Sequence, residues 1–432
     1  MSFPKYSKYK ASGVEWLGEV PEHWDVHSLR HGLSELFSGV TSTQVDETEM
    51  TVPVTRIETI SSGIIDESRL GFINADEARE DRKLRKGDIL FSNINSLNMI
   101  GNCAVYSGGR VIYAGMNLLV LRPSIQSEPR WLYWLIRSPI FREVVESLAK
   151  PAINQASISQ ASINSIAVPV PEGSEQTAIA TFLDRETAKI DGLVAEQRRL
   201  MELLKEKRQA VISHVVTKGL NPSAKMKPSG VEWLGDVPEH WEVRRLKHNL
   251  QLLTGKTDKR DNPVALENIE GWTGRFISTE TEFQGEGVAF DAGDILFGKL
   301  RPYLAKAYRA ESSGEAVGDF HVLRPVATIN SRFAQYQILN REFIAIVDGS
   351  TFGSKMPRAS WEFVGGMQVT APPLAEQTAI AAFLDQETAR FDTLTAEAQR
   401  AIDLLQERRT ALISAAVTGQ IDVRNMTTKE TA

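Results

Sequence analysis

The chain repeats itself, and this duplication constrains its fold more than any other feature of the sequence. Residues 12–31 and 229–248, here called the lead-ins, are identical at 15 of 20 positions. Residues 175–192 and 376–393 form a second matching pair. Each second copy therefore follows its first copy at a similar distance along the chain. A period near 200 residues indicates a duplicated domain rather than a solenoid of short units.

Two dissimilar segments separate the repeated ones. They nevertheless share two short motifs, Gly-Asp-Ile-Leu-Phe and Val-Leu-Arg-Pro. The motifs begin at Gly87 and Val120 in the first copy and at Gly293 and Val322 in the second. The chain therefore reads as a lead-in, a divergent domain and a repeated helix, followed by the same series again.

The second pair of repeats predicts two long helices. Apolar residues recur three and four positions apart, as in a helical seam, and charged residues cover the other face. Gly219 and Gly419 stand where each helix should end. About 40 residues at 1.5 Å each give roughly 60 Å per helix. The predicted seam and docking residues are Ile179, Leu183, Ile190, Leu193, Leu200, Leu204, Val211, Ile380, Leu384, Phe391, Leu394, Leu405 and Leu412.

An apolar seam needs a partner, and the nearest one is its own copy, which predicts an antiparallel coiled coil within the chain. The alternative is that each helix packs only on its own domain. The expected fold class is α+β, with two mixed α/β domains joined by the two helices as an internal pseudo-two-fold duplication. The predicted parts are a first domain with its lead-in at 1–170, a first spacer helix at 171–218, a second domain with its lead-in at 219–371, a second spacer helix at 372–420 and a C-terminal tail at 421–432.

Within the divergent domains, strand-forming residues and helical patterns alternate. Residues 110–123 and 315–325 are rich in strand formers between turn residues. Residues 131–149 and 332–349 predict one helix each. Twisted sheets with flanking helices are expected in both domains.

The charge balance is that of an ordinary globular protein, with a net charge of −6 and a pI near 5.8. Residues 32–170 and 249–371 each hold 13 basic and 15 acidic side chains. A nucleic-acid-binding protein usually has a basic surplus. Any contact with DNA must therefore use local clusters, with partner subunits supplying some of the affinity for phosphate.

Motifs of catalysis are absent from the sequence. The nearest match to a phosphate-binding loop, Gly255-Lys256-Thr257, has Leu250 where the first glycine is required. No methyltransferase, metalloprotease or serine-hydrolase signature occurs, and the single cysteine, Cys103, allows no cysteine-based metal site. We therefore expect no catalytic residue, no metal site and no bound cofactor in this chain.

Polar and basic residues near predicted strand ends and loops are the candidate DNA contacts, since Asn and Gln can read adenine and Arg and Lys can read guanine. In the first domain they are Arg82, Lys83, Arg85, Lys86, Ser92, Asn93, Asn95, Asn98, Asn154, Gln155, Ser157 and Gln160. In the second domain they are Lys256, Lys259, Arg260, Lys299, Arg301, Tyr303, Lys355 and Arg358.

Four of the eight tryptophans lie in the lead-ins, at Trp16, Trp24, Trp233 and Trp241. They could form an aromatic platform for bases, or they could fill gaps beside a helix. A base-reading element should differ between two domains that read different bases. Because the two lead-ins are nearly identical, the structural interpretation is favoured.

The chain resembles the specificity subunit of type I restriction–modification systems, the HsdS family, over nearly its whole length. The resemblance rests on the paired lead-ins, on the two Glu-Gln-Thr-Ala-Ile-Ala helices, and on the segment from Gly293 to Tyr303. The first domain departs from this pattern with Ser92-Asn93-Ile94 after the shared motif, so a role in DNA contact transfers more firmly to Lys299 and Arg301.

The resemblance implies that each divergent domain reads half of a split double-stranded DNA site. It also implies that the helices dock two modification subunits, which are adenine methyltransferases that bring S-adenosylmethionine. Restriction subunits, as translocase and nuclease, would bring ATP and Mg. The chain itself would be non-catalytic and cytoplasmic, as the absence of an apolar signal core also indicates.

Half-sites one helical turn apart lie about 34 Å from centre to centre, which a helix pair of roughly 60 Å can span. We therefore expect helix length to set the number of unread base pairs. Two other functions stay open at this point. The chain could be a protein-only coiled-coil scaffold, as its acidic balance favours, or an enzyme in its own right, against which the missing motifs argue.

Overall fold

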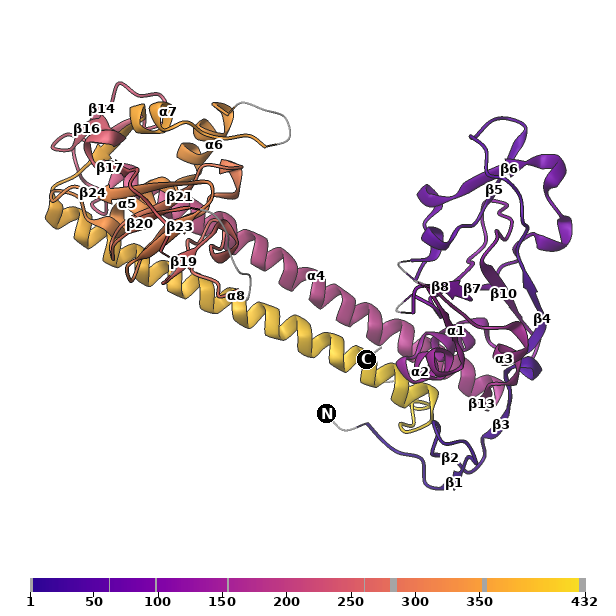
Figure 1. Ribbon diagram of the computed structural model, residues 1–432. Coiled ribbons are helices and arrows are strands. Elements are labelled where there is room, and N and C mark those ends of the chain that lie inside the picture. Colours follow the sequence, from indigo (N-terminus) through magenta and orange to yellow (C-terminus); the bar gives the residue numbers. More distant parts are fainter. Residues whose placement is uncertain are drawn as a thin grey trace. The chain divides into compact units, whose positions relative to one another are not determined.

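The computed structural model describes residues 3–61, 63–97, 99–153, 155–259, 261–279, 286–351 and 356–426. The chain forms two compact units that do not follow chain order. The first unit comprises Met1–Glu196 and Ala401–Ala432, and the second comprises Gln197–Arg400. Each unit thus holds one divergent domain together with part of both long helices (Figure 1).

A four-stranded antiparallel sheet forms the centre of the first unit, in the order β4–β10–β7–β9. These strands are β4 (Leu33–Ser38), β10 (Leu118–Pro123), β7 (Ile89–Ser92) and β9 (Cys103–Val105). Apolar residues of β7 and β10, including Leu90, Leu118 and Val120, are buried in its core. The helices α1 (Pro129–Arg137) and α2 (Pro139–Leu148) follow β10.

The second unit is built on a sheet of the same order, β17–β24–β21–β22, although the two sequences differ. The strands are β17 (Leu250–Leu253), β24 (Phe320–Pro325), β21 (Ile295–Gly298) and β22 (Ala307–Arg309). A further sheet has the order β18–β20–β23–β19. The helices α5 (Ser331–Ile338) and α6 (Arg341–Gly349) follow β24, as α1 and α2 follow β10.

The remaining elements are short. In the first unit they are β1 (Tyr9–Ala11), β2 (Glu19–Pro21), β3 (Asp25–Ser28), β5 (Thr51–Val54), β6 (Gly71–Asn74), β8 (Ile94–Asn95), β11 (Lys150–Ala152), β12 (Gln155–Ser157), β13 (Ala167–Val170), α3 (Gln160–Ser165) and the 3-10 helices η1 (Leu29–Gly32), η2 (Ile57–Ile60), η3 (Glu67–Arg69), η4 (Ala75–Glu77) and η5 (Glu80–Arg82). In the second unit they are β14 (Met226–Pro228), β15 (Asp236–Pro238), β16 (Glu242–Arg245), β18 (Lys256–Thr257), β19 (Pro263–Val264), β20 (Gly287–Phe290), β23 (Gly314–Val317), β25 (Gln368–Ala371), α7 (Trp361–Gly366), η6 (Leu246–His248), η7 (Leu266–Asn268) and η8 (Pro302–Leu304).

The two shared sequence motifs are joined by an ion pair in each unit. In the first unit, the Arg122 guanidinium donates Nε–H to one oxygen of Asp88 at 2.9 Å and Nη2–H to the other at 2.8 Å. The side chains are 7% and 1% exposed. Glu35 accepts a further bond from Arg122 at 2.8 Å. This bidentate ion pair gives the buried guanidinium acidic hydrogen-bond partners and links β10 to the start of β7.

Arg324 and Asp294 repeat this pair in the second unit. The guanidinium donates to both oxygens of Asp294, at 2.9 and 2.7 Å, and to Asp291 at 2.6 Å. The hydrogen bond with Asp294 is the main cause that raises the pKa of Arg324 above its usual value. The shared motifs therefore serve the fold of each unit rather than the reading of a ligand.

The two long helices, α4 (Gly173–Lys218) and α8 (Leu374–Val417), pack together in an antiparallel sense. In the first unit Arg409 donates to Asp191 at 2.9 Å. In the second unit Arg208, nearly buried, donates to Asp392 at 2.6 Å. Asp191 and Arg208 are separated by the same number of residues on α4 as Asp392 and Arg409 are on α8. The two ion pairs are therefore consistent with a single antiparallel register. The predicted α+β fold with two packed long helices is confirmed.

The buried seam between these helices is close to the predicted one. Ile179, Leu183, Ile190, Leu204, Ile380, Leu384, Phe391 and Leu412 are buried, and Val211 and Leu405 are partly buried. As seam residues, Leu193, Leu200 and Leu394 were predicted wrongly, because they are exposed, while their role in docking stays a prediction. Val194, Ala398 and Ile402 are buried there instead. Successive residues of a helix point about 100° apart around its axis. A seam extrapolated from leucine spacing alone therefore shifts away from the face that contacts the other helix.

Other local predictions also needed correction. The single helices expected at 131–149 and 332–349 are each two helices, because Ser138 and Asn340 accept backbone N–H bonds as caps of α2 and α6. Only Leu118–Pro123 of the strand expected at 110–123 is a strand. The segment 315–325 contains most of β23 and all of β24.

The lead-in tryptophans serve packing, as the near-identity of the lead-ins indicated. Trp24 and Trp241 are buried. Trp241 lies in a core with Ile212 of α4 and Ile380 of α8. Trp16 and Trp233, partly buried, lie edge-on to Phe141 and Phe343 respectively. An aromatic platform for bases is therefore wrong for Trp24 and Trp241.

We predict that Asp88→Asn lowers the free energy of unfolding of the first unit by about 3 kcal/mol, because the buried Arg122 charge keeps only Glu35 as an acidic partner. Urea denaturation followed by tryptophan fluorescence measures the loss. The matched control is Asp291→Asn, which leaves the half-exposed Arg324 paired with Asp294 and should cost less than about 1 kcal/mol. Equal losses from the two variants would contradict the structural role of the buried pair.

Candidate nucleic-acid interface

In the second unit, the loop after β21 and the segment before α7 lie side by side. The Arg301 N–H donates to the Pro357 carbonyl at 2.9 Å, and the Ala359 N–H donates to the Lys299 carbonyl at 2.9 Å. Leu300 and Arg358 form a β-bridge between these bonds. The structure therefore brings together three of the predicted contacts, Lys299, Arg301 and Arg358, from two segments that are distant in the sequence.

Asp319 orders two of these cations. The Arg358 guanidinium donates to both of its oxygens, at 3.2 and 2.9 Å, and the Lys299 ammonium lies 3.7 Å from one of them. The hydrogen bond with Asp319 raises the pKa of Arg358. Arg301 and Tyr303 are exposed, and no described residue pairs with the Arg301 guanidinium. Arg301 is thus available to an anion or a base edge.

The same loop holds backbone strain. Arg301 and Ala305, with φ of 50° and 48°, lie in the left-handed region on either side of η8. Such a conformation costs of order 1–3 kcal/mol for a residue other than glycine, and it is concentrated at functional sites. It sets the direction in which the Arg301 Cα–Cβ bond leaves the loop.

His321 supports this loop from beneath. Its buried Nε2 lies 3.0 Å from the carbonyl of Ala359. Burial is the main cause that lowers the pKa of His321 below its usual value, and the Lys299 charge lowers that pKa further. The imidazole is therefore neutral at pH 7 and donates Nε2–H to this carbonyl.

The first unit has the same junction with different side chains. The Ile158 N–H donates to the Asn93 carbonyl at 2.9 Å, and Ser157 pairs with Ile94 where β12 meets β8. Asn95, Gln155 and Ser157 lie on this small sheet, and Gln155 and Ser157 are exposed. Amide and hydroxyl groups thus stand where the second unit has cations.

The structure contradicts the prediction that Ser92 contacts DNA. Ser92 is fully buried at the end of β7, and its hydroxyl accepts a bond from the Asn95 amide at 3.2 Å. It therefore orients Asn95 and does not reach a ligand. Asn93 is partly buried and contributes its carbonyl to the junction.

In the predicted basic cluster at residues 82–86 three cations have acidic partners, and a role of this cluster in DNA contact stays a prediction. Arg82 pairs with Asp81 at 3.3 Å, Lys83 with Glu80 at 3.0 Å and Arg85 with Glu35 at 3.8 Å. Lys86 is exposed at the end of this run. The cluster precedes β7 and Asn95 follows it, so the two groups lie at opposite ends of this strand.

The other candidates lie on other elements. Gln160 begins α3 and donates to Ser38 at 2.9 Å. Lys256 pairs with Glu286 at 2.5 Å on the β18–β20 pair, and Lys259 is exposed beyond it. Four predicted contacts lie outside the described residues, namely Asn98, Asn154, Arg260 and Lys355.

Sequence reasoning missed Asp319 and two exposed apolar residues beside the junctions. Ile153, between β11 and β12, is almost fully exposed, and Met356, before Arg358, is also exposed. Apolar side chains of this kind can contact a thymine methyl group or enter between base steps. Only their exposure in the structure singles them out, since an apolar residue in a loop carries no sequence signal.

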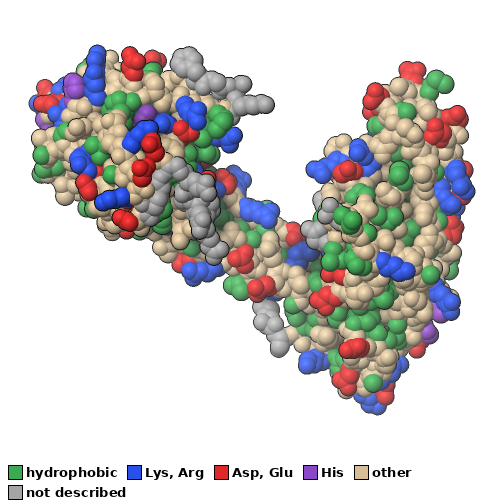
Figure 2. All heavy atoms as spheres, in the orientation of Figure 1, with side chains coloured by type: hydrophobic (Ala, Val, Ile, Leu, Met, Phe, Trp, Pro, Cys, Tyr) green, Lys and Arg blue, Asp and Glu red, His purple; other side chains and the backbone are tan. Residues whose placement is uncertain are grey.

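Charges of both signs are mixed over the face shown in Figure 2, where lysine and arginine alternate with aspartate and glutamate. Among the described residues no group of three or more metal-ligating side chains could hold an ion. No helix searched in the described part of the chain is long and apolar enough to cross a membrane.

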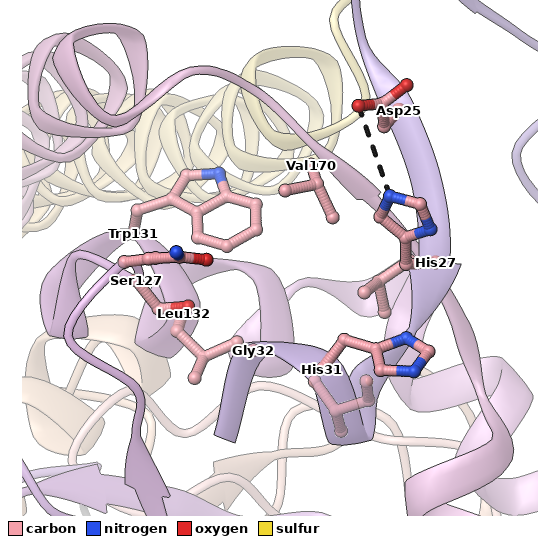
Figure 3. A pocket seen from close by; sticks show the side chains of 11 residues that line it. Asp25, His27, His31, Gly32, Ser127, Trp131, Leu132 and Val170 are labelled. Atoms are coloured by element: carbon pink, nitrogen blue, oxygen red, sulfur yellow. Dashed lines mark ion pairs between the residues drawn. The ribbon is translucent and has the colours of Figure 1, made fainter. Parts of the chain in front are cut away.

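A pocket of about 450 Å³ opens beside the first lead-in, where His27 and His31 face Trp131 and Leu132 of α1 (Figure 3). His27 lies 3.9 Å from Asp25. In the second unit Arg244 replaces His27 and donates to Thr328 at 3.4 Å. The pocket lies on elements apart from the junctions.

Comparisons with known proteins agree with this arrangement. The model of the type I restriction modification DNA specificity domain matches residues 21–199. A protein of Methanocaldococcus jannaschii named as a type I restriction enzyme MjaX specificity subunit is 27% identical over 98% of this chain and 99% of its own length. The EcoKI specificity subunit of Escherichia coli is 23% identical over 94% of this chain and 90% of its own length.

The chain is therefore similar to type I restriction–modification specificity subunits over nearly its whole length, and residues 21–199 match the model of their DNA specificity domain. Solved structures share its fold. A chain from a study of assembly and conformational transition in the type I R-M system has a TM-score of 0.69 at 15% identity, covering 92% of this chain and 98% of that one. The HsdS subunit of Thermoanaerobacter tengcongensis has a TM-score of 0.55 at 15% identity, covering 93% and 98%.

If the chain reads DNA as its relatives' names imply, we predict that Arg301→Ala relaxes the sequence preference at one position of one half-site in the target of the assembled complex. Binding of the assembled complex should weaken by about tenfold, since a bidentate contact to guanine contributes about 1–3 kcal/mol. Competition binding against single-base variants of the target measures both effects.

The matched control is Arg245→Ala, which removes an exposed arginine from the second lead-in. It should leave the preference at every base unchanged. An unaltered preference in the Arg301→Ala variant would exclude Arg301 from base reading.

Proposed function

We propose that this chain is a specificity subunit that reads a bipartite double-stranded DNA target, with one half-site per divergent domain. One observation carries the proposal: both units place a junction of two segments after the same strand, yet fill it with unlike side chains. Asn95, Gln155 and Ser157 occupy it in the first unit, and Lys299, Arg301 and Arg358 in the second. A shared scaffold with unlike surfaces suits two different ligand sequences.

The chemistry of the two junctions fits base edges in the major groove. Amides such as those of Asn95 and Gln155 can pair bidentately with adenine, and Arg301 can pair with guanine O6 and N7. Lys299 and Arg358, held by Asp319, suit phosphate contacts that position the domain. The side-chain sets therefore support different half-sites for the two domains.

The long helices also suit the docking of modification subunits. Exposed leucines occur along them where the seam does not cover the surface. They are Leu193, Leu200, Leu203, Leu394 and Leu404. Apolar side chains repeated along one helix pair are characteristic of a protein interface. Two modification subunits, one for each helix end, match the internal duplication.

The chain would act without catalysing a reaction itself. Modification subunits would bring S-adenosylmethionine, restriction subunits would bring ATP and Mg, and the complex would work in the cytoplasm. The protein-only scaffold that the acidic composition left open has no support from the comparisons.

A map of N6-methyladenine tests the proposal. In a methylation-free host, this chain expressed with its modification subunit should produce a new motif of two short half-sites around a fixed gap. The modification subunit alone is the control. An assembled complex that produces no new motif would refute the reading of DNA sequence by this chain.

Helix length should set the gap between the half-sites. Because Arg208 faces Asp392 and Asp191 faces Arg409, position 200 of α4 faces position 400 of α8. Four residues inserted after Leu200 and four after Arg400 add one turn to each helix and about 6 Å to the pair. The gap in the methylated motif should grow by about two base pairs.

The control replaces the same four residues on each helix without changing its length. The half-sites themselves should stay as they are in the parent. A gap of unchanged length in the insertion variant would exclude the helices as the ruler.

A further inference from the structure

The two units differ in how they cover the first turns of their long helices. In the first unit, residues 3–6 lie over the start of α4. In the second unit, the start of α8 has the same sequence, Glu-Gln-Thr-Ala-Ile-Ala. The connection that leads from α4 to the second lead-in, residues 219–228, contains no aromatic residue like Phe3 or Tyr6. The pseudo-equivalent surfaces can therefore be compared within one chain.

In the first unit, Tyr6 closes the site around Glu175. The Tyr6 hydroxyl donates to Glu175 at 2.5 Å, and His23 lies 3.0 Å from the second carboxylate oxygen. The Arg424 guanidinium lies over the Tyr6 ring, 4.9 Å from its centre. The Glu175 side chain is 4% exposed as a result. Burial is the main cause that raises the pKa of Tyr6, so its hydroxyl remains a donor.

Phe3 covers a second point on the same face of α4. Its ring lies edge-on to Phe182 at 5.7 Å, and Phe182 is 1% exposed. Between the two aromatic residues, the Pro4 carbonyl accepts the Asp422 N–H at 2.8 Å. An extended segment with aromatic side chains three positions apart thus spans from Phe182 to Glu175.

In the second unit, both equivalent positions lie open. Glu376 corresponds to Glu175, and its side chain is 42% exposed. It pairs with His240 at 2.6 Å and accepts the Trp241 indole N–H at 2.9 Å. Phe383 corresponds to Phe182 and is 37% exposed. A carboxylate has about four acceptor sites, so Glu376 can accept a further hydrogen bond from a hydroxyl group.

A pocket of about 410 Å³ lies at this point. Its lining includes Gly219, Leu220, His240, Glu376, Ala379 and Ile380. Ile380 forms its buried base, and Ala379 lies exposed at its wall. The lining combines the Glu376 carboxylate and the His240 ring with Lys218, Asn221 and apolar side chains. In the first unit the Tyr6 ring likewise lies beside the equivalent carboxylate and histidine, Glu175 and His23.

The chain does not fill this pocket itself. Lys225 corresponds to Lys8, because their carbonyls accept the N–H groups of the equivalent residues Glu239 and Glu22. On this alignment Ser223 stands at the position of Tyr6, and its side chain is too short to replace the ring.

We propose that the pocket at Glu376 receives a tyrosine from an extended segment of a partner protein. The tyrosine hydroxyl donates to Glu376, and an aromatic residue three positions earlier packs on Phe383. The first unit supplies the template, since Phe3 and Tyr6 make the same pair of contacts there. This proposal goes beyond the reading of DNA and does not depend on it.

A labelled synthetic peptide with the sequence of residues 2–10 is the probe, and fluorescence polarisation with the full chain measures its binding. We expect saturable binding. Replacing the peptide tyrosine that corresponds to Tyr6 with phenylalanine should weaken it by about tenfold, because a hydrogen bond to a charged group is lost.

Ala379→Glu should abolish binding of the peptide, since it places a charged side chain in the wall of the pocket. Ala382→Glu is the matched control, because Ala382 is exposed on the same helix and does not line the pocket. Absence of binding to the parent chain, or equal binding to both variants, would overturn the proposal.

A photoreactive residue at position 379 of the assembled complex identifies the occupant. The expected crosslink joins position 379 to a tyrosine-bearing segment of another subunit. Crosslinks confined to copies of this chain, or to partner segments without an aromatic residue, would also overturn the proposal. The methylation motif is a separate measurement, so failure here leaves the reading of DNA unaffected.

Discussion

The antiparallel pairing of α4 with α8 is the constraint on which the rest of the structure depends. Each helix carries an apolar stripe that is unstable in water alone, and each compact unit contains part of both helices. The ion pairs Asp191–Arg409 and Arg208–Asp392 fix one register for this pairing. Neither divergent domain is therefore complete without a helix that begins in the other half of the chain.

Within each unit, the residues that hold the fold are separate from those that present a surface. The Asp88–Arg122 and Asp294–Arg324 pairs tie equivalent strands together in both copies. Directly after the same strand, the junction side chains diverge into amides and hydroxyls in one unit and cations in the other. A duplicated chain can thus change what it recognises without changing the contacts that keep its sheets in order.

The sequence predicted the duplication, the helices and the α+β class because sequence identity and hydrophobic periodicity can be read from the residues alone. It failed where distant residues decide the outcome. Arg85 reads as a free cation until Glu35, from a separate strand, lies beside it. Ser92 reads as a polar contact until the sheet buries it, and Leu193 reads as a seam residue until the helix contact passes through Val194. The candidate interface was foreseen only in part for the same reason. Lys299 and Arg301 adjoin a recognisable motif, whereas their neighbour Asp319 is visible only once β24 pairs with β21.

The symmetry of the duplication is broken where the two long helices start. In the first unit, residues 3–6 and 421–426 meet over the start of α4. In the second unit, the chain runs continuously from α4 into the second lead-in. A single segment therefore passes the start of α8, whereas two separate segments meet over the start of α4. The exposure of Glu376 and Phe383 follows from this difference. Near-identical sequences on the two helices therefore differ in what they leave available to a partner.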